Sequence, residues 1–275
     1  MPRPGLPKLI ATDLDGTLVH SDDTVSAYTH EVLDRVRAAG IPVVGATGRG
    51  PRLTELTRND IRAADYLVLA GGGRVVDLTD PEAGPLVLRD DRLDGHVLAS
   101  IVTLLEAEVG PLTVFVEALD WPNAPLWGDD DPAWRYRESF EVRPRAEALA
   151  ERVIKGFARR PDHDVDALVA AARRVVPPSV ATITQSGLGF IEILPPGVDK
   201  ASGLAVVAAT LGVDPAEVLV FGDMPNDVPM FEWAGWGRVA VANAHDTVLA
   251  LADEVTLSND EDGVAVYLDR LLGRA

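Results

Sequence analysis

The 275-residue chain contains no cysteine and no long apolar segment. Without cysteine it has no disulfide framework, which small secreted domains commonly need for stability. The longest uncharged apolar run, at about residues 203–213, is well short of the ~18 residues that span a bilayer. The first residues also lack the apolar stretch of a signal peptide. We therefore expect a cytoplasmic protein that does not associate with membranes.

Positive charge is also scarce, since the formal net charge is −18 at pH 7. Nucleic acids and anionic membranes are bound by basic surfaces, so neither is an expected partner. An anionic small molecule would need a local cationic group. Among the 25 basic residues, the lysines are Lys8, Lys155 and Lys200, and all others are arginine. A lysine in such an arginine-rich chain is a candidate for a specific role, and Lys200 opens a predicted helix.

Apolar residues make up 47% of the chain, which is enough for one large domain or two modest ones. Alternating buried-type strands and amphipathic helices at both ends predict an α/β fold with a Rossmann-like, doubly wound parallel sheet. The composition changes near residue 84, and the helix and strand alternation resumes near residue 195. We predict a core of residues 1–84 and 195–275, with a second α/β (α+β) module inserted at residues 85–194. An antiparallel sheet is expected in the insert.

The stretch around which the chain is organised is Leu9–Leu18. Its apolar, strand-length beginning stops at Asp13 and Asp15, which are followed by Gly16 and Thr17. Residues two apart on a strand share a face, and open α/β sheets bind ligands beyond the carboxyl ends of their strands. Both carboxylates are therefore expected to reach one crevice. An Asp-Gly pair alone would indicate only a turn, but the whole string is far more specific.

Three further groups of polar residues are expected at the same edge of the sheet. One follows a strand that ends at Ala46, one opens a helix, and one follows a strand that ends at Phe221. The first group is Thr47, Gly48 and Arg49, the second is Lys200 alone, and the third is Asp223, Asn226 and Asp227.

Together these groups meet the requirements of phosphoryl transfer, in which positioning and charge stabilisation do most of the catalysis. Asp13 is the predicted nucleophile, which forms an aspartyl-phosphate, and Asp15 is the predicted general acid and base. Crowded carboxylates require a cation, and all-oxygen ligands favour Mg²⁺. The predicted ligands are Asp13, the backbone carbonyl of Asp15, Asp223, and Asp227 either directly or through water.

The other polar residues are predicted to bind the phosphoryl group. Thr47 and the amides around Gly48 would donate hydrogen bonds to its oxygens, and Lys200 would neutralise its charge and keep Asp13 ionised. Asn226 is a further candidate for substrate binding. Arg49 fits a phosphate contact and a surface position about equally well.

These residues resemble the motifs of the haloacid dehalogenase (HAD) superfamily of phosphohydrolases, and within it the Cof-like branch with a type IIB cap. The four motifs are similar to Asp13–Leu18, Thr47–Arg49, Lys200 and Gly222–Asp227, in that order along the chain. The resemblance implies a Rossmann-like core with a cap domain inserted between the second and third motifs. It also implies Mg²⁺ dependence and phosphatase activity on a small phosphorylated metabolite, with a sugar phosphate expected first.

Two positions depart from the family pattern. Gly71–Gly73 stands where many relatives carry Asn-Gly, and Met224 stands where the third residue of the fourth motif is often small. Neither removes a catalytic group, so both bear on the substrate alone. In the insert, Trp121, Trp127 and Trp134 either stack on a sugar or heteroaromatic ring or pack within the cap.

Two other functions also fit the sequence. One is a glycosyl-phosphate phosphatase of the sucrose-phosphate or mannosyl-phosphoglycerate type, which has a similar core and cap. The other is a non-hydrolysing phosphoaspartate signalling or binding protein, since receiver domains also place Asp, Thr and Lys on a doubly wound sheet. A receiver domain lacks the insert and a counterpart to Asp15. A monomer and a homodimer are equally compatible with the sequence.

Overall fold

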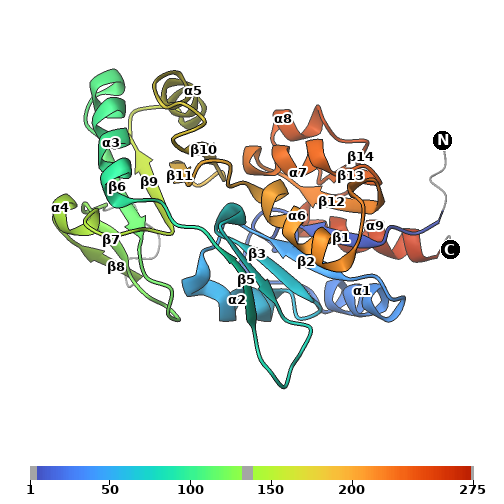
Figure 1. Cartoon of the computed structure of the whole chain (residues 1–275). Helices are drawn as coiled ribbons and strands as arrows, with labels where there is room; N and C mark the ends of the chain where they lie inside the picture. The colour runs from blue at the N-terminus through green and yellow to red at the C-terminus, as the bar shows by residue number, and fades with distance from the viewer. Residues whose placement is uncertain (1–4, 132–138, 274–275) are drawn as a thin grey trace.

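Two β-sheets organise the protein, and Figure 1 shows them as two lobes that lie next to each other. The structure is a computed structural model that describes residues 5–131 and 139–273. None of the helices within these ranges is both long enough and apolar enough to cross a bilayer.

The larger sheet is mostly parallel. Strands β4 and β5 run antiparallel to their neighbours, whereas the other adjacent pairs are parallel. The parallel strands near its centre are fully buried, as expected for a sheet covered on both faces. The strand order is β14 (Glu254–Val255), β13 (Gly237–Ala240), β12 (Val218–Gly222), β1 (Leu9–Thr12), β2 (Val43–Ala46), β3 (Tyr66–Leu69), β4 (Arg74–Asp77) and β5 (Leu86–Asp90).

Strand β1 lies at the centre of this sheet. From β1 the chain moves outward through β2 and β3, whereas β12, β13 and β14 extend the sheet in the opposite direction. β1 and β12 therefore meet at the topological switch point, where open α/β sheets bind ligands. Thr12 pairs with both Phe221 and Gly45, so these three neighbouring strands end at about the same level. The expected Rossmann-like, doubly wound core is confirmed.

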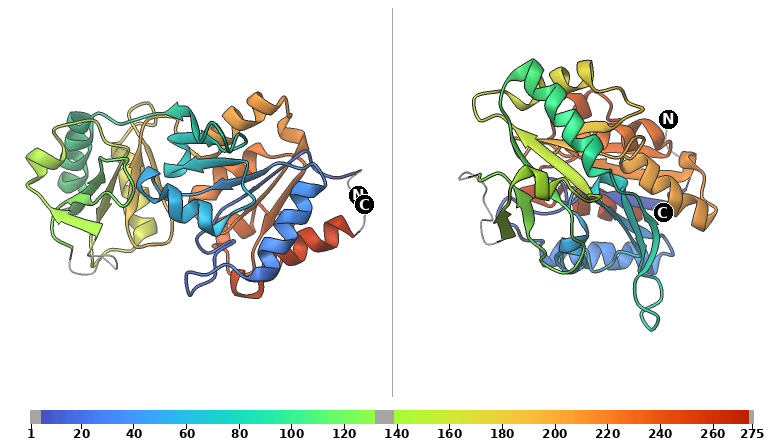
Figure 2. Two further views of the ribbon diagram at one scale, coloured as in Figure 1. Left: turned by 90° about the horizontal axis from the view of Figure 1, so that it is seen from below. Right: turned by 60° about the vertical axis from the view of Figure 1, so that its left-hand side comes forward.

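Helices cover both faces of the larger sheet. Helix α1 begins after its N-cap Ser26, whose hydroxyl oxygen accepts a hydrogen bond from the backbone N–H of Thr29. Figures 1 and 2 show α1 and α9 on one face and α6 and α7 on the other. The elements are α1 (Ala27–Ala38), α2 (Thr54–Asp60), α6 (Lys200–Leu211), α7 (Val228–Trp233), α8 (Asp246–Leu249) and α9 (Gly263–Leu272), with short 3₁₀ turns η1 (Pro51–Leu53), η2 (Ala70–Gly72), η4 (Pro215–Glu217), η5 (Pro225–Asp227) and η6 (Asn259–Glu261).

The smaller sheet is antiparallel except for the parallel pair β7 and β8. Helices α3 and α5 cover one of its faces, with Val114, Val116 and Ala158 in the apolar layer beneath them. The strand order is β10 (Thr182–Gln185), β11 (Ile191–Leu194), β9 (Lys155–Arg159), β6 (Thr113–Glu117), β7 (Leu126–Gly128) and β8 (Phe140–Val142), and the helices are α3 (Gly95–Val109), α4 (Arg145–Ala148) and α5 (Val165–Val175).

Strand β5 belongs to the larger sheet, although the predicted insert begins at residue 85. We propose that the insert begins after Asp90, where the chain leaves this sheet and enters α3. The division into residues 1–84 with 195–275 and residues 85–194 otherwise stays a prediction.

Trp121 and Trp127, the two predicted cap tryptophans within the described residues, lie in different environments. Trp127 pairs with Val116 on β6 and packs with the apolar layer under α3 and α5, which favours internal packing for this residue. Its indole lies under the Arg143 guanidinium, 3.9 Å from the ring centroid. Trp121 is exposed, and Trp134 lies outside the described residues.

The glycines after β3 have a structural role. Gly72 has a φ of +113°, and a β-carbon there would lie 2.0 Å from the backbone oxygen of Asp199. Asp199 is the N-cap of α6, and its carboxylate accepts a hydrogen bond from the backbone N–H of Ser202. Glycine therefore lets η2 pack against the start of the helix that carries Lys200.

Replacing Gly72 with alanine should lower the free energy of unfolding by about 2 kcal/mol or more. The alanine backbone would be strained at this positive φ, and its β-carbon would also clash with the backbone of Asp199. Urea unfolding followed by circular dichroism measures this loss. Gly84→Ala is the matched control, since Gly84 has a φ of +77° and nothing within 4 Å of its β-carbon position. It should cost less, and equal losses in the two variants would contradict the close-packing role.

Candidate active site

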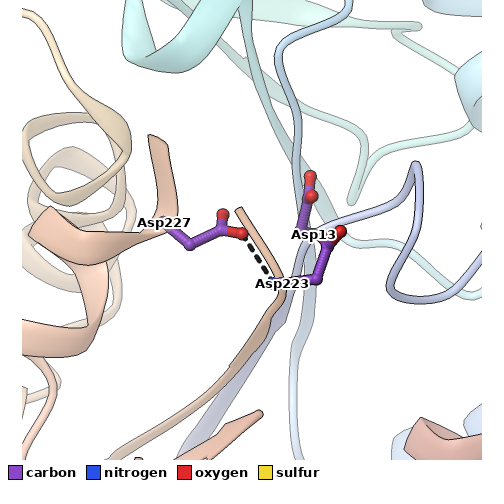
Figure 3. A group of neighbouring side chains, drawn as sticks. All are labelled: Asp13, Asp223 and Asp227. Atoms are coloured by element: carbon purple, nitrogen blue, oxygen red, sulfur yellow. Dashed lines mark hydrogen bonds between the residues drawn. The ribbon is translucent and has the colours of Figure 1, made fainter. Parts of the chain in front are cut away.

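Three buried aspartates meet at the switch point of the larger sheet. Asp13 follows β1, Asp223 follows β12, and Asp227 ends the short turn η5. One carboxylate oxygen from each lies within 4.8 Å of the others, and Figure 3 shows the three side chains close together, two from strand ends and Asp227 from η5. The structure thus brings together three of the predicted metal ligands.

Lys200 is the cation of this cluster. It is the first residue of α6 and is fully buried. Its Nζ lies 2.6 Å from Asp13 Oδ1 and 2.6 Å from Asp227 Oδ1. Burial alone would lower the pKa of Lys200, but the two carboxylates outweigh burial and raise it. Lys200 therefore stays charged, and it holds one oxygen of Asp13 in place.

One ammonium group does not balance three carboxylates. Burial raises the pKa of Asp13 well above its usual range, and the neighbouring Asp227 adds to the effect. Burial and Asp227 likewise raise the pKa of Asp223 to about 7. A divalent cation would relieve this repulsion, and an all-carboxylate donor set suits a hard cation. The residues present therefore fit a divalent metal site.

Asp227 differs from the other two aspartates because the protein already uses both of its oxygens. Oδ1 accepts from Lys200, and Oδ2 accepts from the backbone N–H groups of Asp223, at 2.9 Å, and Met224, at 3.0 Å. Gly222 allows this approach, since a β-carbon there would lie 2.7 Å from Asp227 Cγ. This geometry favours a water-mediated contact with a metal over direct ligation by Asp227.

Thr47 and Gly48 lie beside the cluster, after β2. The Thr47 hydroxyl oxygen accepts a hydrogen bond from the backbone N–H of Arg49 at 3.0 Å, which leaves its proton to donate to a ligand. A β-carbon on Gly48 would lie 3.7 Å from Asn226 Nδ2. Thr47, Gly48 and Asn226 thus border one region, as the sequence predicted.

Arg49 is mostly buried and pairs with two carboxylates. Its guanidinium is mostly buried, donates to both oxygens of Asp15 at 2.6–3.1 Å, and also donates to Asp60 at 2.5 Å. The side chain of Asp15 remains half exposed. The structure therefore places the Arg49 guanidinium between Asp15 and Asp60.

Sequence reasoning missed three residues that reach this region from the smaller sheet. Lys155 on β9 donates a hydrogen bond to the backbone carbonyl of Gly48, while Glu117 on β6 and Glu192 on β11 lie against the loop that contains Gly48 and Gly50. The rarity of lysine was the one available signal, and it applied to Lys155 as it did to Lys8 and Lys200. Each glutamate stands between apolar residues on its strand, a pattern that equally fits a solvent-facing side chain.

Comparisons with known proteins agree with this geometry. A model of the haloacid dehalogenase-like hydrolase family matches residues 10–268. The chain is 31% identical to the 5-amino-6-(5-phospho-D-ribitylamino)uracil phosphatase YwtE of Bacillus subtilis, over 96% of this chain and 98% of that protein. It is 31% identical to a phosphoglycolate phosphatase of Archaeoglobus fulgidus, over 96% of this chain and 97% of that protein. Its fold is similar to that of the HAD subclass IIB sugar phosphatase BT4131, with a TM-score of 0.79 at 21% identity, covering 98% of this chain and 100% of that one.

The raised pKa of Asp223 predicts a pH-dependent affinity for divalent cations. A cation binds the ionised carboxylate, so protons compete with it below about pH 7. Titration of Asp223 alone should make the affinity rise as the pH increases through about 7, with about tenfold weaker binding one pH unit below its pKa than well above it. The shift of the thermal midpoint caused by Mg²⁺ should therefore be larger at pH 8 than at pH 6.

Asp223→Asn is the control for this measurement, and it should remove most of the shift and its pH dependence. Equal shifts at both pH values in the parent protein would show that the cation binds elsewhere.

Proposed function

The chain belongs to the family of haloacid dehalogenase-like hydrolases and is a phosphatase of this family, and from this premise we propose its reaction. It hydrolyses the phosphomonoester of a small phosphorylated metabolite, and a sugar phosphate is the first substrate that we expect. The reaction uses Mg²⁺ and passes through an aspartyl-phosphate on Asp13. The observation that carries the proposal is the carboxylate of Asp13 at the switch point, where Lys200 binds its Oδ1 at 2.6 Å and the Thr47 loop lies beside it.

The reaction has two steps. In the first, the free carboxylate oxygen of Asp13 attacks phosphorus while the bond between phosphorus and the leaving-group oxygen breaks, and Asp15 gives that oxygen a proton. In the second, Asp15 takes a proton from the water that attacks phosphorus, which releases phosphate and restores Asp13. Thr47, the amides near Gly48, and Lys200 stabilise the charge on the phosphoryl oxygens.

Asp13 and Asp223 would hold Mg²⁺ directly, the backbone carbonyl of Asp15 would add a ligand, and Asp227 would contribute through water. When bound, Mg²⁺ neutralises negative charge on the phosphoryl group and helps to orient it. Asp227 also supports the site without metal, because it ties Lys200 to the loop after β12.

Arg49 acts through Asp15 in this proposal. Its guanidinium meets both oxygens of Asp15 and is fixed by Asp60, which sets the direction of the Asp15 carboxylate. A direct contact between Arg49 and phosphate, the other predicted role, would require Arg49 to leave one of these carboxylates.

The inserted module would act as the cap that selects the leaving group, because the core residues above account for the phosphoryl group alone. The relatives named above act on a phosphoribitylamino-uracil and on phosphoglycolate, so the phosphoryl chemistry is shared while the leaving group varies. The inserted sheet, and Asp15 two residues after the proposed nucleophile, oppose a receiver-type signalling protein. We also propose a cytoplasmic protein, monomeric or homodimeric, without a nucleic-acid or membrane partner.

Two variants separate the roles of the aspartates. Asp13→Asn should abolish turnover of p-nitrophenyl phosphate in the presence of Mg²⁺, because the nucleophile is lost. Asp15→Asn should lower kcat by about 10²–10⁴-fold for an alkyl phosphate, but by less for p-nitrophenyl phosphate, whose leaving group needs little protonation.

Steady-state kinetics on both substrates, with circular dichroism to confirm folding, measure these effects. Substantial activity in Asp13→Asn would refute the nucleophile assignment. Equal losses on the two substrates in Asp15→Asn would refute the general-acid assignment.

A further inference from the structure

One face of the smaller sheet carries charged residues into the predicted active site. Glu117 on β6 pairs with Lys155 on β9, and Glu192 on β11 pairs with Phe157, two residues after Lys155. Side chains alternate along a strand, so Glu117, Lys155 and Glu192 point to the same face, opposite α3 and α5. All three are at least 97% buried, because this face meets the loop after β2.

The two glutamates contact different parts of that loop. Glu117 lies against Gly50, where a β-carbon would be 2.0 Å from its carboxylate, and it accepts from the backbone N–H of Arg52 at 3.4 Å. Glu192 lies against Gly48, where a β-carbon would be 3.4 Å from Oε1. Glu192 is therefore the carboxylate nearer the predicted phosphoryl site, and Glu117 supports the loop further along.

Of the two carboxylate oxygens of Glu192, one accepts a hydrogen bond from the described residues and the other does not. Its Oε1 accepts a hydrogen bond from the Ser186 hydroxyl at 2.9 Å. Its Oε2 is buried and receives no hydrogen bond from the described residues, although Lys155 Nζ lies 3.3 Å away and offsets its charge. Lys155 is itself held by the carbonyl of Gly48. Buried acceptors are normally hydrogen-bonded, so Oε2 indicates a place for a donor from a ligand.

Asn226 supplies a second acceptor of the same kind. It follows β12 on the larger sheet and is 94% buried. Its Oδ1 receives no hydrogen bond within the described part of the chain. Its Nδ2 lies 3.7 Å from the β-carbon position of Gly48, which Glu192 also approaches. Two acceptors without a hydrogen bond from the described residues, one from each sheet, thus flank Gly48, next to Thr47.

We infer that Glu192 and Asn226 form a subsite for the leaving group, which binds hydroxyl groups of a neutral polyhydroxylated alcohol. This inference rests on the proposed phosphatase function and assigns its specificity to these residues. A carboxylate accepts hydrogen bonds, so it favours hydroxyl donors and disfavours a leaving group with its own carboxylate. Lys155 does not reverse this preference, because Glu192 and Gly48 already engage it. A sugar phosphate and a ribityl phosphate would both satisfy the subsite.

The test compares substrates that share the phosphoryl group and differ in the leaving group. Ribitol 5-phosphate presents hydroxyls, p-nitrophenyl phosphate presents none, and 2-phosphoglycolate presents a carboxylate. Glu192→Gln should lower kcat/KM for ribitol 5-phosphate by about tenfold or more, because it weakens a hydrogen bond to a charged acceptor. The substitution should change kcat/KM for p-nitrophenyl phosphate much less. It should raise kcat/KM for 2-phosphoglycolate relative to that for ribitol 5-phosphate.

Glu117→Gln is the matched control, since it removes the same charge from the same face of the sheet. It should leave the ratio of kcat/KM for ribitol 5-phosphate to that for p-nitrophenyl phosphate unchanged. An unchanged ratio in Glu192→Gln, or the same change in both variants, would overturn the assignment of Glu192.

A binding measurement separates failure of the subsite from failure of the proposed function. Calorimetric titration of Asp13→Asn with ribitol 5-phosphate needs no turnover, and adding Glu192→Gln should weaken the affinity about tenfold. Equal affinities would overturn the subsite even if the enzyme hydrolyses phosphomonoesters. A parent protein that hydrolyses none of the three substrates would overturn the function, while the titration still decides the subsite.

Discussion

The buried ammonium group of Lys200 holds together a cluster of carboxylates that would otherwise repel one another. It contacts Asp13 and Asp227 at 2.6 Å each, and Asp227 in turn accepts two backbone N–H groups of the loop that carries Asp223. Removing one partner of such a buried pair typically costs about 3–5 kcal/mol, so the ends of β1 and β12 and the start of α6 are fixed together. The remaining negative charge is what makes the site suited to a divalent cation and then to a phosphoryl group.

The loop after β2 links this cluster to the inserted module. Gly48 and Gly50 have no side chains, and this lets Glu192, Glu117 and Lys155 approach the loop from the smaller sheet. In our proposal, Asp13, Thr47 and Lys200 of the core act on phosphorus and its oxygens, whereas Glu192 of the insert and Asn226 of the core bind what is attached to them. Such a separation of roles would let related proteins keep the same phosphoryl chemistry while changes in the insert alter the substrate. The relatives named above act on different leaving groups, which agrees with this view.

The sequence predicted what local patterns determine. Asp13 and Asp223 follow apolar strands, and that pattern correctly placed both at one sheet edge. The role of Arg49 was left open because its partners Asp15 and Asp60 are set by tertiary packing. Glu192 was missed because alternation along a strand does not tell which face of the second sheet meets the core. From the sequence, Gly71–Gly73 was related only to the choice of substrate. The structure adds that Gly72 lies close to the backbone of Asp199, where a side chain would not fit.

The central claim, a covalent intermediate on Asp13, is tested most directly by trapping it. An acyl phosphate is reduced by borohydride to an alcohol, so an aspartyl-phosphate becomes homoserine. Turnover of p-nitrophenyl phosphate with Mg²⁺ would be stopped within milliseconds, reduced, and analysed by peptide mass spectrometry. The account predicts homoserine at position 13 only, and none without substrate. Homoserine at another aspartate, or its absence during active turnover, would contradict the account.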